Sequence, residues 1–500
     1  MKTYQDLQKC GDNENLRIDF IYAAIRDHEQ SDAFIIGHKA GQFYRHHDPN
    51  IEAYQNVVYD IQGKPHVDEI SPNHKIMCNF FQKLIDQAIQ YLLGNGINFD
   101  NPQIKEQLST QLDHRVKKIA KYASVDGRGY GLVDTTADGK KELHPMCFAC
   151  QLDGNEPYFV PLYDERSGKL AAGIKYWRLA EDKPLMATLY EPDGYTEYQE
   201  YPQGEEEEPR LTVTSEKAPY IVNRLSNEAQ GVYGAQGENY KALPIIEMHY
   251  INNQSALVGN EGTLTAYNMA LSGFANQVDW NLLYWIINNA DGMSEQDDIN
   301  FLADIIKTHV LHTSGDATAT PHEITIQHEA RGQLLDRLRT QLYEDMGGVD
   351  VSKTSANMTA TEIKSAYAAL NSKCDDIESY IDEFLTQMLD LLGFEGETWH
   401  YQRDVTINTS EETNNAIASA PYFGRKWTTK RLASAAGMID ELPAIEEDLA
   451  AEQAEQAGFA AGNDSESVAD SIAERIISAL KEFFSGIFGK RSDNDADTEE

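Results

Sequence analysis

Residues 361–393 read TEIKSAYAALNSKCDDIESYIDEFLTQMLDLLG and carry the clearest pattern in the chain. Side chains that can pack in a core recur at alternating steps of four and three from Ile363 to Leu391, which predicts one amphipathic helix. At a rise of 1.5 Å per residue, this helix would be roughly 50 Å long. The stripe of apolar residues along this helix, its seam, fits either of two structures. One is a free-standing coiled coil that oligomerises by itself, and the other is a spine helix that packs within its own domain. We favour the spine, because predicted helices on both sides could cover the seam.

Two adjacent glycines, Gly347 and Gly348, lie upstream of this helix. They follow a shorter predicted helix, residues 329–346, whose apolar positions again step by three and four. A glycine costs about 1 kcal/mol in the interior of a helix. The pair therefore predicts a break, and we place a loop at residues 347–359.

Further upstream, apolar side chains from Leu264 to Trp285 keep helical spacing and predict one long helix within residues 259–291. A small insert, residues 292–328, separates it from the helix at 329–346. We expect the insert to contain a short helix around Ile299–Ile306 and two strands, Thr308–Thr313 and Glu323–His328.

Residues from Tyr122 to about Tyr250 have a different texture, in which short β-branched and aromatic runs alternate with turn signals. Ala137-Asp138-Gly139-Lys140 and Glu191-Pro192-Asp193-Gly194 are two of these signals. The pattern predicts an antiparallel β region built from hairpins. Two helices, 71–94 and about 102–122, are predicted before it, and two short helices are predicted within residues 1–40.

The composition limits the function. The chain has 500 residues, enough for about three domains, with 42 Lys and Arg against 81 Asp and Glu and a net charge of −39. This surplus argues against a protein that grips nucleic acid by neutralising phosphates, although DNA could still pass by it. No run of about 20 apolar residues is present, so we expect no membrane partner. Five cysteines in so long a chain predict no disulfide framework.

Chemical motifs are weak. Cys147-Phe148-Ala149-Cys150 lacks the second pair of ligands that structural zinc requires, so we interpret the two thiols as half-buried in a strand. His46-His47-Asp48 is interpreted as a solvated loop. Gly127-Arg128-Gly129-Tyr130-Gly131 has the wrong spacing for a dinucleotide fingerprint. We expect no metal, no cofactor and no enzymatic activity.

The order of the pieces is more specific than any single motif. A helix ending in Tyr91-Leu92-Leu93-Gly94 precedes a β region that contains Pro161-Leu162-Tyr163-Asp164-Glu165 and Lys175-Tyr176-Trp177. Pro244-Ile245-Ile246-Glu247-Met248 and a helix beginning near Leu264 follow, and then the insert, the glycine break and the long helix. Over about residues 40–460 this order resembles the portal proteins of tailed bacteriophages, in particular of siphophages that infect Gram-positive hosts.

The resemblance implies an α+β portal-type subunit with an antiparallel β-rich wing, a two-helix stem, a small αββ clip, a long spine helix and a helical crown, assembled as a ring. The implied parts are an N-terminal arm (1–40), the wing (41–258), the first stem helix (259–291), the clip (292–328), the second stem helix (329–346), the tunnel loop (347–359), the spine helix (360–393), a wing return strand (394–410), the crown (411–460) and a C-terminal amphipathic helix with an acidic tail (461–500).

The resemblance also implies a function. Portal rings, usually of twelve subunits, occupy one capsid vertex, and double-stranded DNA passes through them during packaging and ejection. The terminase large subunit docks on the clip and is later replaced by head completion or connector proteins, while major capsid and scaffolding proteins surround the ring. The implied location is the virion, after assembly in the host cytoplasm. The candidate residues are, in the tunnel loop, Gly347, Gly348, Val349, Asp350, Ser352, Lys353 and Thr354 and, in the clip, His309, His312, Ser314, Gly315, Asp316 and His322.

The charge agrees with this interpretation, since an acidic channel wall repels the duplex and keeps it sliding. Two other classes of protein remain open. One is a coiled-coil scaffold or adaptor that binds partners through residues 361–393 and a predicted amphipathic helix at 466–488. The other is a metal-dependent enzyme that uses Cys147, Cys150 and nearby acids.

Overall fold

The computed structural model describes residues 2–59, 63–68, 71–136, 139–154, 156–180, 182–202, 209–227, 232–279, 283–288, 318–323, 328–353, 360–403, 416–422 and 424–435, with a few positions between 442 and 449. The chain forms two compact units. The first comprises residues 1–351 and 367–404, and the second comprises residues 352–366 and 405–500.

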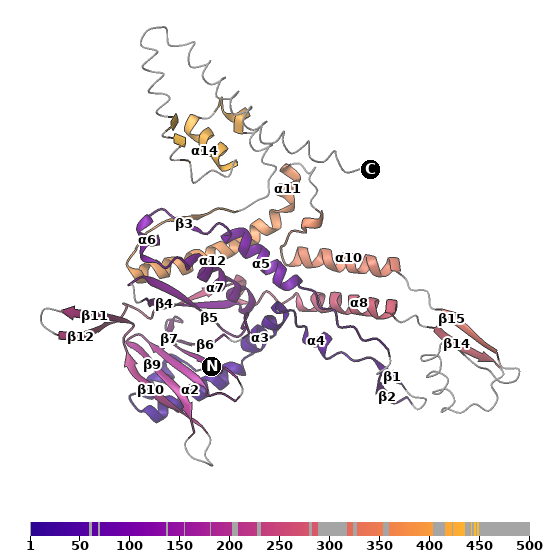
Figure 1. Ribbon diagram of the computed structural model, residues 1–500, viewed down its shortest axis with the longest axis horizontal. Helices are drawn as coiled ribbons and strands as arrows, with labels where there is room; N and C mark the ends of the chain where they lie inside the picture. The colour runs from indigo at the N-terminus through magenta and orange to yellow at the C-terminus, as the bar shows by residue number, and fades with distance from the viewer. Residues whose placement is uncertain are drawn as a thin grey trace, which may run out of the picture. The chain divides into compact units, whose positions relative to one another are not determined.

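An eight-stranded sheet is the centre of the first unit, with the order β10-β9-β8-β7-β6-β5-β4-β13 (Figure 1). Its strands are β4 (Arg128–Thr135), β5 (Lys141–Cys147), β6 (Tyr158–Tyr163), β7 (Leu170–Trp177), β8 (Met186–Glu191), β9 (Gly194–Tyr201), β10 (Arg210–Ala218) and β13 (Ile245–His249). Neighbouring strands are antiparallel except β5 and β6, which meet in parallel at Cys147 and Tyr158. The predicted antiparallel hairpins are confirmed, with a turn at Pro192-Asp193 between β8 and β9.

The N-terminal residues form three helices, α1 (Tyr4–Lys9), α2 (Glu14–Glu29) and α3 (Asp32–Tyr44), and not the two that we expected. Each begins after a residue whose side chain accepts a backbone N–H of the first turn: Thr3, Asn13 and Ser31. Helices α1 and α2 share one hydrophobic core with the inward residues of β6 to β10. Interpreting residues 1–40 as an arm is therefore wrong, because they belong to the core of the sheet domain.

Four more helices and three small strand pairs complete this part of the unit. They are α4 (Pro49–Glu52), α5 (Phe80–Leu93), α6 (Pro102–Gln107), α7 (Leu112–Asp126), β1 (Val57–Tyr59) with β2 (Pro65–Val67), β3 (Ile97–Phe99) with β16 (Trp399–Tyr401), and β11 (Ile221–Asn227) with β12 (Val232–Glu238). The helix predicted at 102–122 is two helices, because Leu108 leaves the helix to bridge Lys141. The second of them, α7, continues past residue 122 to Asp126, and Gly127 ends it with a φ of 82°.

Helix α8 (Glu261–Asp279) binds an extended segment, residues 71–79, that we predicted to be helical. Asn268, Ser272 and Asn276, four residues apart on α8, accept the backbone N–H groups of Cys78, Ile76 and His74 at 3.0, 2.9 and 2.6 Å. Four helical residues rise about 6 Å, and two extended residues rise about 6.6 Å, so the two repeats match. The predicted helix 71–94 consequently begins only at Phe80.

Helix α10 (His328–Asp345) lies beside α8, and β14 (Leu283–Asn288) pairs with β15 (Thr318–Glu323) beyond their ends (Figure 1). The long helix predicted over 259–291 is therefore wrong at Leu283–Asn288, which form β14. Trp285-Ile286-Ile287 suit a strand, and backbone pairing with β15 decides their conformation. Of the predicted strand Glu323–His328, Glu323 lies in β15 as expected, His328 belongs to α10 instead, and residues 324–327 lie outside the described part. The predicted helix at 299–306 and strand at 308–313 lie outside the described residues.

The spine helix is divided. Helix α11 (Ala360–Ala366) precedes α12 (Ala368–Leu392), with a turn at Tyr367, so one continuous helix over 360–393 is wrong. The apolar spacing did not indicate this turn, because the steps of three and four continue through it. The spine interpretation holds for α12, whose seam is buried within the first unit; the buried residues are Leu370, Cys374, Ile377, Ile381, Phe384, Leu385, Met388 and Leu389.

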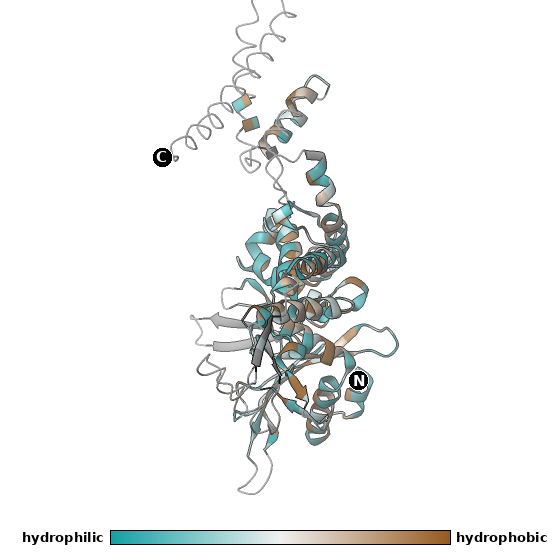
Figure 2. Ribbon diagram, turned by 90° about the vertical axis from the view of Figure 1, so that its right-hand side faces the viewer, coloured by the Kyte–Doolittle hydropathy of each residue, from teal (hydrophilic) through white to brown (hydrophobic). Residues whose placement is uncertain are grey.

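The return strand is short. Of the strand predicted within 394–410, the structure shows Trp399–Tyr401, and residues 404–410 lie outside the described part. In the second unit, α14 (Arg425–Ala435) falls within the predicted crown, while residues 461–500 lie outside the described part. None of the described helices combines the length and apolarity needed to cross a membrane, and Figure 2 shows hydrophilic residues interspersed along them.

Candidate functional site

The break after α10 has the geometry that glycine allows. Gly347 has a φ of 60°, a left-handed conformation that side chains disfavour. Its N–H donates to the carbonyl of Glu344 at 3.2 Å, and the N–H of Gly348 donates to the carbonyl of Tyr343 at 2.8 Å. These bonds satisfy carbonyls that the helix end leaves open. The predicted break at Gly347-Gly348 is confirmed.

Gly348 is required for a second reason, which is close packing. A Cβ added there would lie 2.3 Å from Cδ2 of Leu84 and 3.1 Å from Oε1 of Gln87, both on α5. Leu84 is fully buried. The backbone thus reaches α5 only because this residue lacks a side chain.

Gln87 fixes the next residue. Its Nε2 donates to the carbonyl of Val349 at 2.9 Å, and its Oε1 accepts the N–H of Val349 at 2.9 Å. The amide therefore pairs with both polar groups of one backbone residue, as a neighbouring strand would. Val349 itself is buried.

Asp350 ties the same segment to α10. Its Oδ1 accepts from Nη2 of Arg339 at 2.9 Å, and this bond is the main reason why the pKa of Arg339 is raised. The Asp350 side chain is only 7% exposed, so replacing Arg339 would take a partner from a largely buried charge, which is destabilising. Contacts with α5 and α10 thus hold the first four candidate loop residues.

Lys373 on α12 caps the end of α10. Its Nζ donates to the carbonyl of Met346 at 2.8 Å, and its stem lies 3.3 Å from where a Cβ on Gly347 would be. Burial lowers the pKa of Lys373 to about 8. The helix end is thus closed by a cation, as the helix dipole favours.

The other flank of the loop returns to α5. The rings of Tyr367 and Tyr91 have centroids 5.8 Å apart, and the Tyr91 hydroxyl donates to Oδ1 of Asn371 at 2.8 Å. Gln87 and Tyr91 are four residues apart and lie on one face of α5. The chain consequently leaves the first unit after Val351 and rejoins it at Tyr367, and the two flanks contact α5 one helical turn apart.

The other predicted site residues are less fully defined. Ser352 and Lys353 are exposed in a short 3-10 turn, Val351–Lys353, while Thr354 lies outside the described residues. Of the predicted clip residues, His322 lies in β15, where it pairs with Tyr284. The remaining five lie outside the described part: His309, His312, Ser314, Gly315 and Asp316.

Sequence reasoning missed the residues that hold the loop in place. Helical spacing places Leu84 and Tyr91 on one apolar face of α5 without showing what that face contacts, and nothing in the sequence links Gln87 or Arg339 to the loop. Gln87 is 262 positions from the residue it pairs with. Gln87 is one of three glutamines on α5, so nothing in the sequence singles it out.

The alternative motifs have structural roles in the described chain. Cys147 and Cys150 are free and completely buried, not half-buried, and Cys150 lies beyond the end of β5. Asp48 is also buried, where it accepts from Nδ2 of Asn268 at 3.0 Å, so His46-His47-Asp48 is not simply a solvated loop. The described residues contain no group of three His, Cys, Asp or Glu side chains placed to hold a metal ion.

The family described as phage portal protein, SPP1 Gp6-like, matches residues 40–457 of this chain. The chain belongs to that family. The resemblance and the portal function that it implied are thereby confirmed. The sequence matches no curated protein.

Two solved structures are similar to this portal subunit. One is the crystal structure of an HK97 family phage portal protein from Corynebacterium diphtheriae, with 11% identity and a TM-score of 0.36, covering 64% of this chain and 90% of that one. The other is the neck of an empty GTA particle computed with C6 symmetry, with 12% identity and a TM-score of 0.36, covering 70% and 88%. The assignment rests on the family match over residues 40–457.

Proposed function

We propose that this portal subunit assembles as a ring, usually of twelve copies, at one vertex of a phage capsid, and that double-stranded DNA is packaged and ejected through its centre. The observation that carries the proposal is the family match over residues 40–457. The acidic composition supports it, since a channel wall that does not neutralise phosphates leaves the duplex free to slide. The role is structural and not enzymatic, and the mature ring belongs to the virion.

The ring itself can be tested directly. Negative-stain electron microscopy of the purified chain should show rings with a central hole. Rods would instead support the coiled-coil scaffold, and a uniformly monomeric protein would contradict assembly by this chain alone. The turn at Tyr367 already weighs against a continuous coiled coil.

In this proposal α8 and α10 are the stem, and the segment that contains β14 and β15 is the clip. A two-stranded pair is at best marginally stable alone, which suits a surface completed by a partner. The terminase large subunit would dock there during packaging, and head completion or connector proteins would replace it. Major capsid and scaffolding proteins would contact the ring elsewhere. The clip candidates named from the sequence are part of this proposal.

The loop after Asp350 would face the DNA, with one exposed lysine, Lys353, as its basic residue between Gly347 and Thr361. An exposed ion contact contributes about 0.2–1 kcal/mol and is screened by salt. We therefore expect Lys353→Ala to assemble and to change packaged DNA by about twofold at most. Lys353→Glu should package less than Lys353→Ala, because it adds repulsion of phosphate. DNA per particle measures both, and equal values for wild type and both variants would remove any electrostatic role of this loop.

A further inference from the structure

The β1–β2 hairpin exposes an apolar face. Its register pairs Val57 with Val67, Val58 with His66 and Tyr59 with Pro65. Because side chains alternate across a strand, Val57, Tyr59, Pro65 and Val67 share one face, while Val58 and His66 share the other. All six residues are exposed, and Tyr59 is 70% exposed. The apolar face thus has no cover within the described part of the chain.

The base of this hairpin is firmly attached. The Asp68 N–H donates to the carbonyl of Asn56 at 2.8 Å, Nδ2 of Asn56 donates to the carbonyl of Pro72 at 3.1 Å, and Nδ2 of Asn73 donates to the carbonyl of Tyr54 at 3.3 Å. The following residues are the extended segment bound along α8. The face is therefore presented in a fixed position, and preorganisation of this kind lowers the cost of binding.

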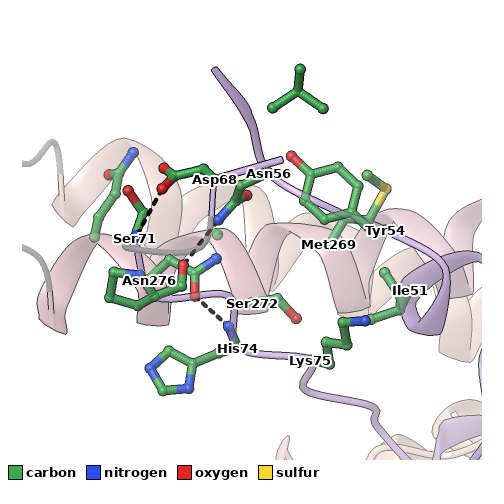
Figure 3. Close-up of a pocket in the computed structure, with 14 residues that line it drawn as sticks. Ile51, Tyr54, Asn56, Asp68, Ser71, His74, Lys75, Met269, Ser272 and Asn276 are labelled. Atoms are coloured by element: carbon green, nitrogen blue, oxygen red, sulfur yellow. Dashed lines mark hydrogen bonds between the residues drawn. The ribbon is translucent and has the colours of Figure 1, made fainter. Parts of the chain in front are cut away.

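A cavity of about 380 Å³ lies between the hairpin base and α8. Figure 3 shows Tyr54 and Met269 next to each other at one side of it, with Asn276 and His74 at the other side. Tyr54, Val57 and Met269 all line the cavity and are 45%, 48% and 44% exposed. Val57 belongs both to the apolar face of the hairpin and to the cavity lining, so the two adjoin. We name them together the hairpin surface: Tyr54, Val57, Tyr59, Val67 and Met269.

The distribution of charge indicates what covers the hairpin surface. Two copies of a chain with a net charge of −39 repel each other unless they meet where acids are scarce. Helix α8 has no charged residue from Gly262 to Val278, although a quarter of the whole chain is charged. The residues that line the cavity include one acid, Asp68, and one base, Lys75.

We propose that the hairpin surface is a contact between neighbouring copies of this chain, in which a second copy packs on Val57, Tyr59, Val67 and Met269. The contact is heterologous, so the partner meets it with a different surface, and repetition closes a ring. This inference rests on the proposed ring and assigns part of its subunit interface. A phage protein of another kind on the same surface is the competing outcome.

Val57 and Val58 provide a matched pair for the test. They are adjacent, identical in type and 48% and 47% exposed, but they lie on opposite faces of β1. In the full-length protein, Val57→Asp should lower the fraction of rings at least tenfold by mass photometry, leaving monomers with the wild-type melting temperature. Val58→Asp should form rings as the wild type does. Tyr59→Asp, at the most exposed position, should repeat the effect of Val57→Asp without a folding cost.

The outcomes separate the two proposals. Wild-type protein that never forms rings would overturn the proposed assembly and this interface with it. Rings in normal amount from both Val57→Asp and Tyr59→Asp would overturn the interface alone and leave the surface to a different protein. Equal loss of rings from Val57→Asp and Val58→Asp would also overturn it, because the apolar face would then have no special role.

Discussion

Asp126→Ala is expected to reduce the yield of soluble portal subunit severely. Oδ2 of Asp126 accepts the backbone N–H groups of Phe148, Ala149 and Cys150 at 3.0, 3.0 and 3.2 Å, and the side chain is buried. Each buried donor left without a partner costs about 1–3 kcal/mol, so three of them cost on the order of 3–9 kcal/mol, a large part of the stability of an ordinary domain.

Soluble yield and the thermal midpoint measure this effect. Asp153→Ala is the control, because Asp153 is 69% exposed and pairs with Lys118 at the surface, where such pairs contribute little. Similar midpoints for Asp126→Ala and Asp153→Ala would show that the three N–H groups find other partners.

The same carboxylate should make stability depend on pH. Burial raises the pKa of Asp126 from 3.8 to about 6, while the N–H donors act in the opposite direction. A folded pKa above the unfolded one means that the stability due to this group is fully present below pH 3.8 and is lost as pH rises through 6. Relative to Asp126→Asn, which does not titrate, the wild type should lose about 2 kcal/mol between pH 4 and pH 7. A constant difference between the two proteins would contradict the raised pKa.

Local pattern predicted the elements whose conformation is decided locally. Helix α10 and the seam of α12 follow from apolar spacing, and the hairpin turn at Pro192-Asp193 follows from turn residues. The prediction of a helix at Leu283–Asn288 was wrong because the apolar spacing there also fits a helix, and only pairing with β15 makes this segment a strand. The prediction of a helix before Phe80 was wrong for a similar reason, because side chains of α8 accept the backbone N–H groups of that segment.

The candidate loop shows the same limit. The glycine pair predicted a break, and glycine's low helix propensity was a sufficient reason. The residues that the glycine pair contacts could not be predicted, because Leu84 and Gln87 lie on a helix more than 250 positions upstream. The contacts of Gly348 favour a fixed anchor from which the loop departs, rather than a moving hinge.

Gly348→Ala should therefore destabilise the portal subunit and displace the loop. The new Cβ would lie 2.3 Å from Cδ2 of Leu84, which is fully buried and has no room to withdraw. Overpacking of this kind costs about 1–3 kcal/mol. Moving residues 347–350 away from α5 would relieve the clash but would break both hydrogen bonds between Gln87 and Val349. We expect a lower thermal midpoint, rings that still form and less DNA per particle.

Gly332→Ala is the matched control, since it lies in the same helix α10 with nothing within 4 Å of its added Cβ. Because alanine is favoured over glycine inside a helix, this variant should gain about 0.5–1 kcal/mol. The double variant Gly348→Ala with Leu84→Ala should recover part of the loss, because the shortened side chain makes room for the Cβ. If Gly348→Ala is as stable as Gly332→Ala, or if Leu84→Ala adds its full cost to it, the glycine is not held against α5 and the loop is not anchored there.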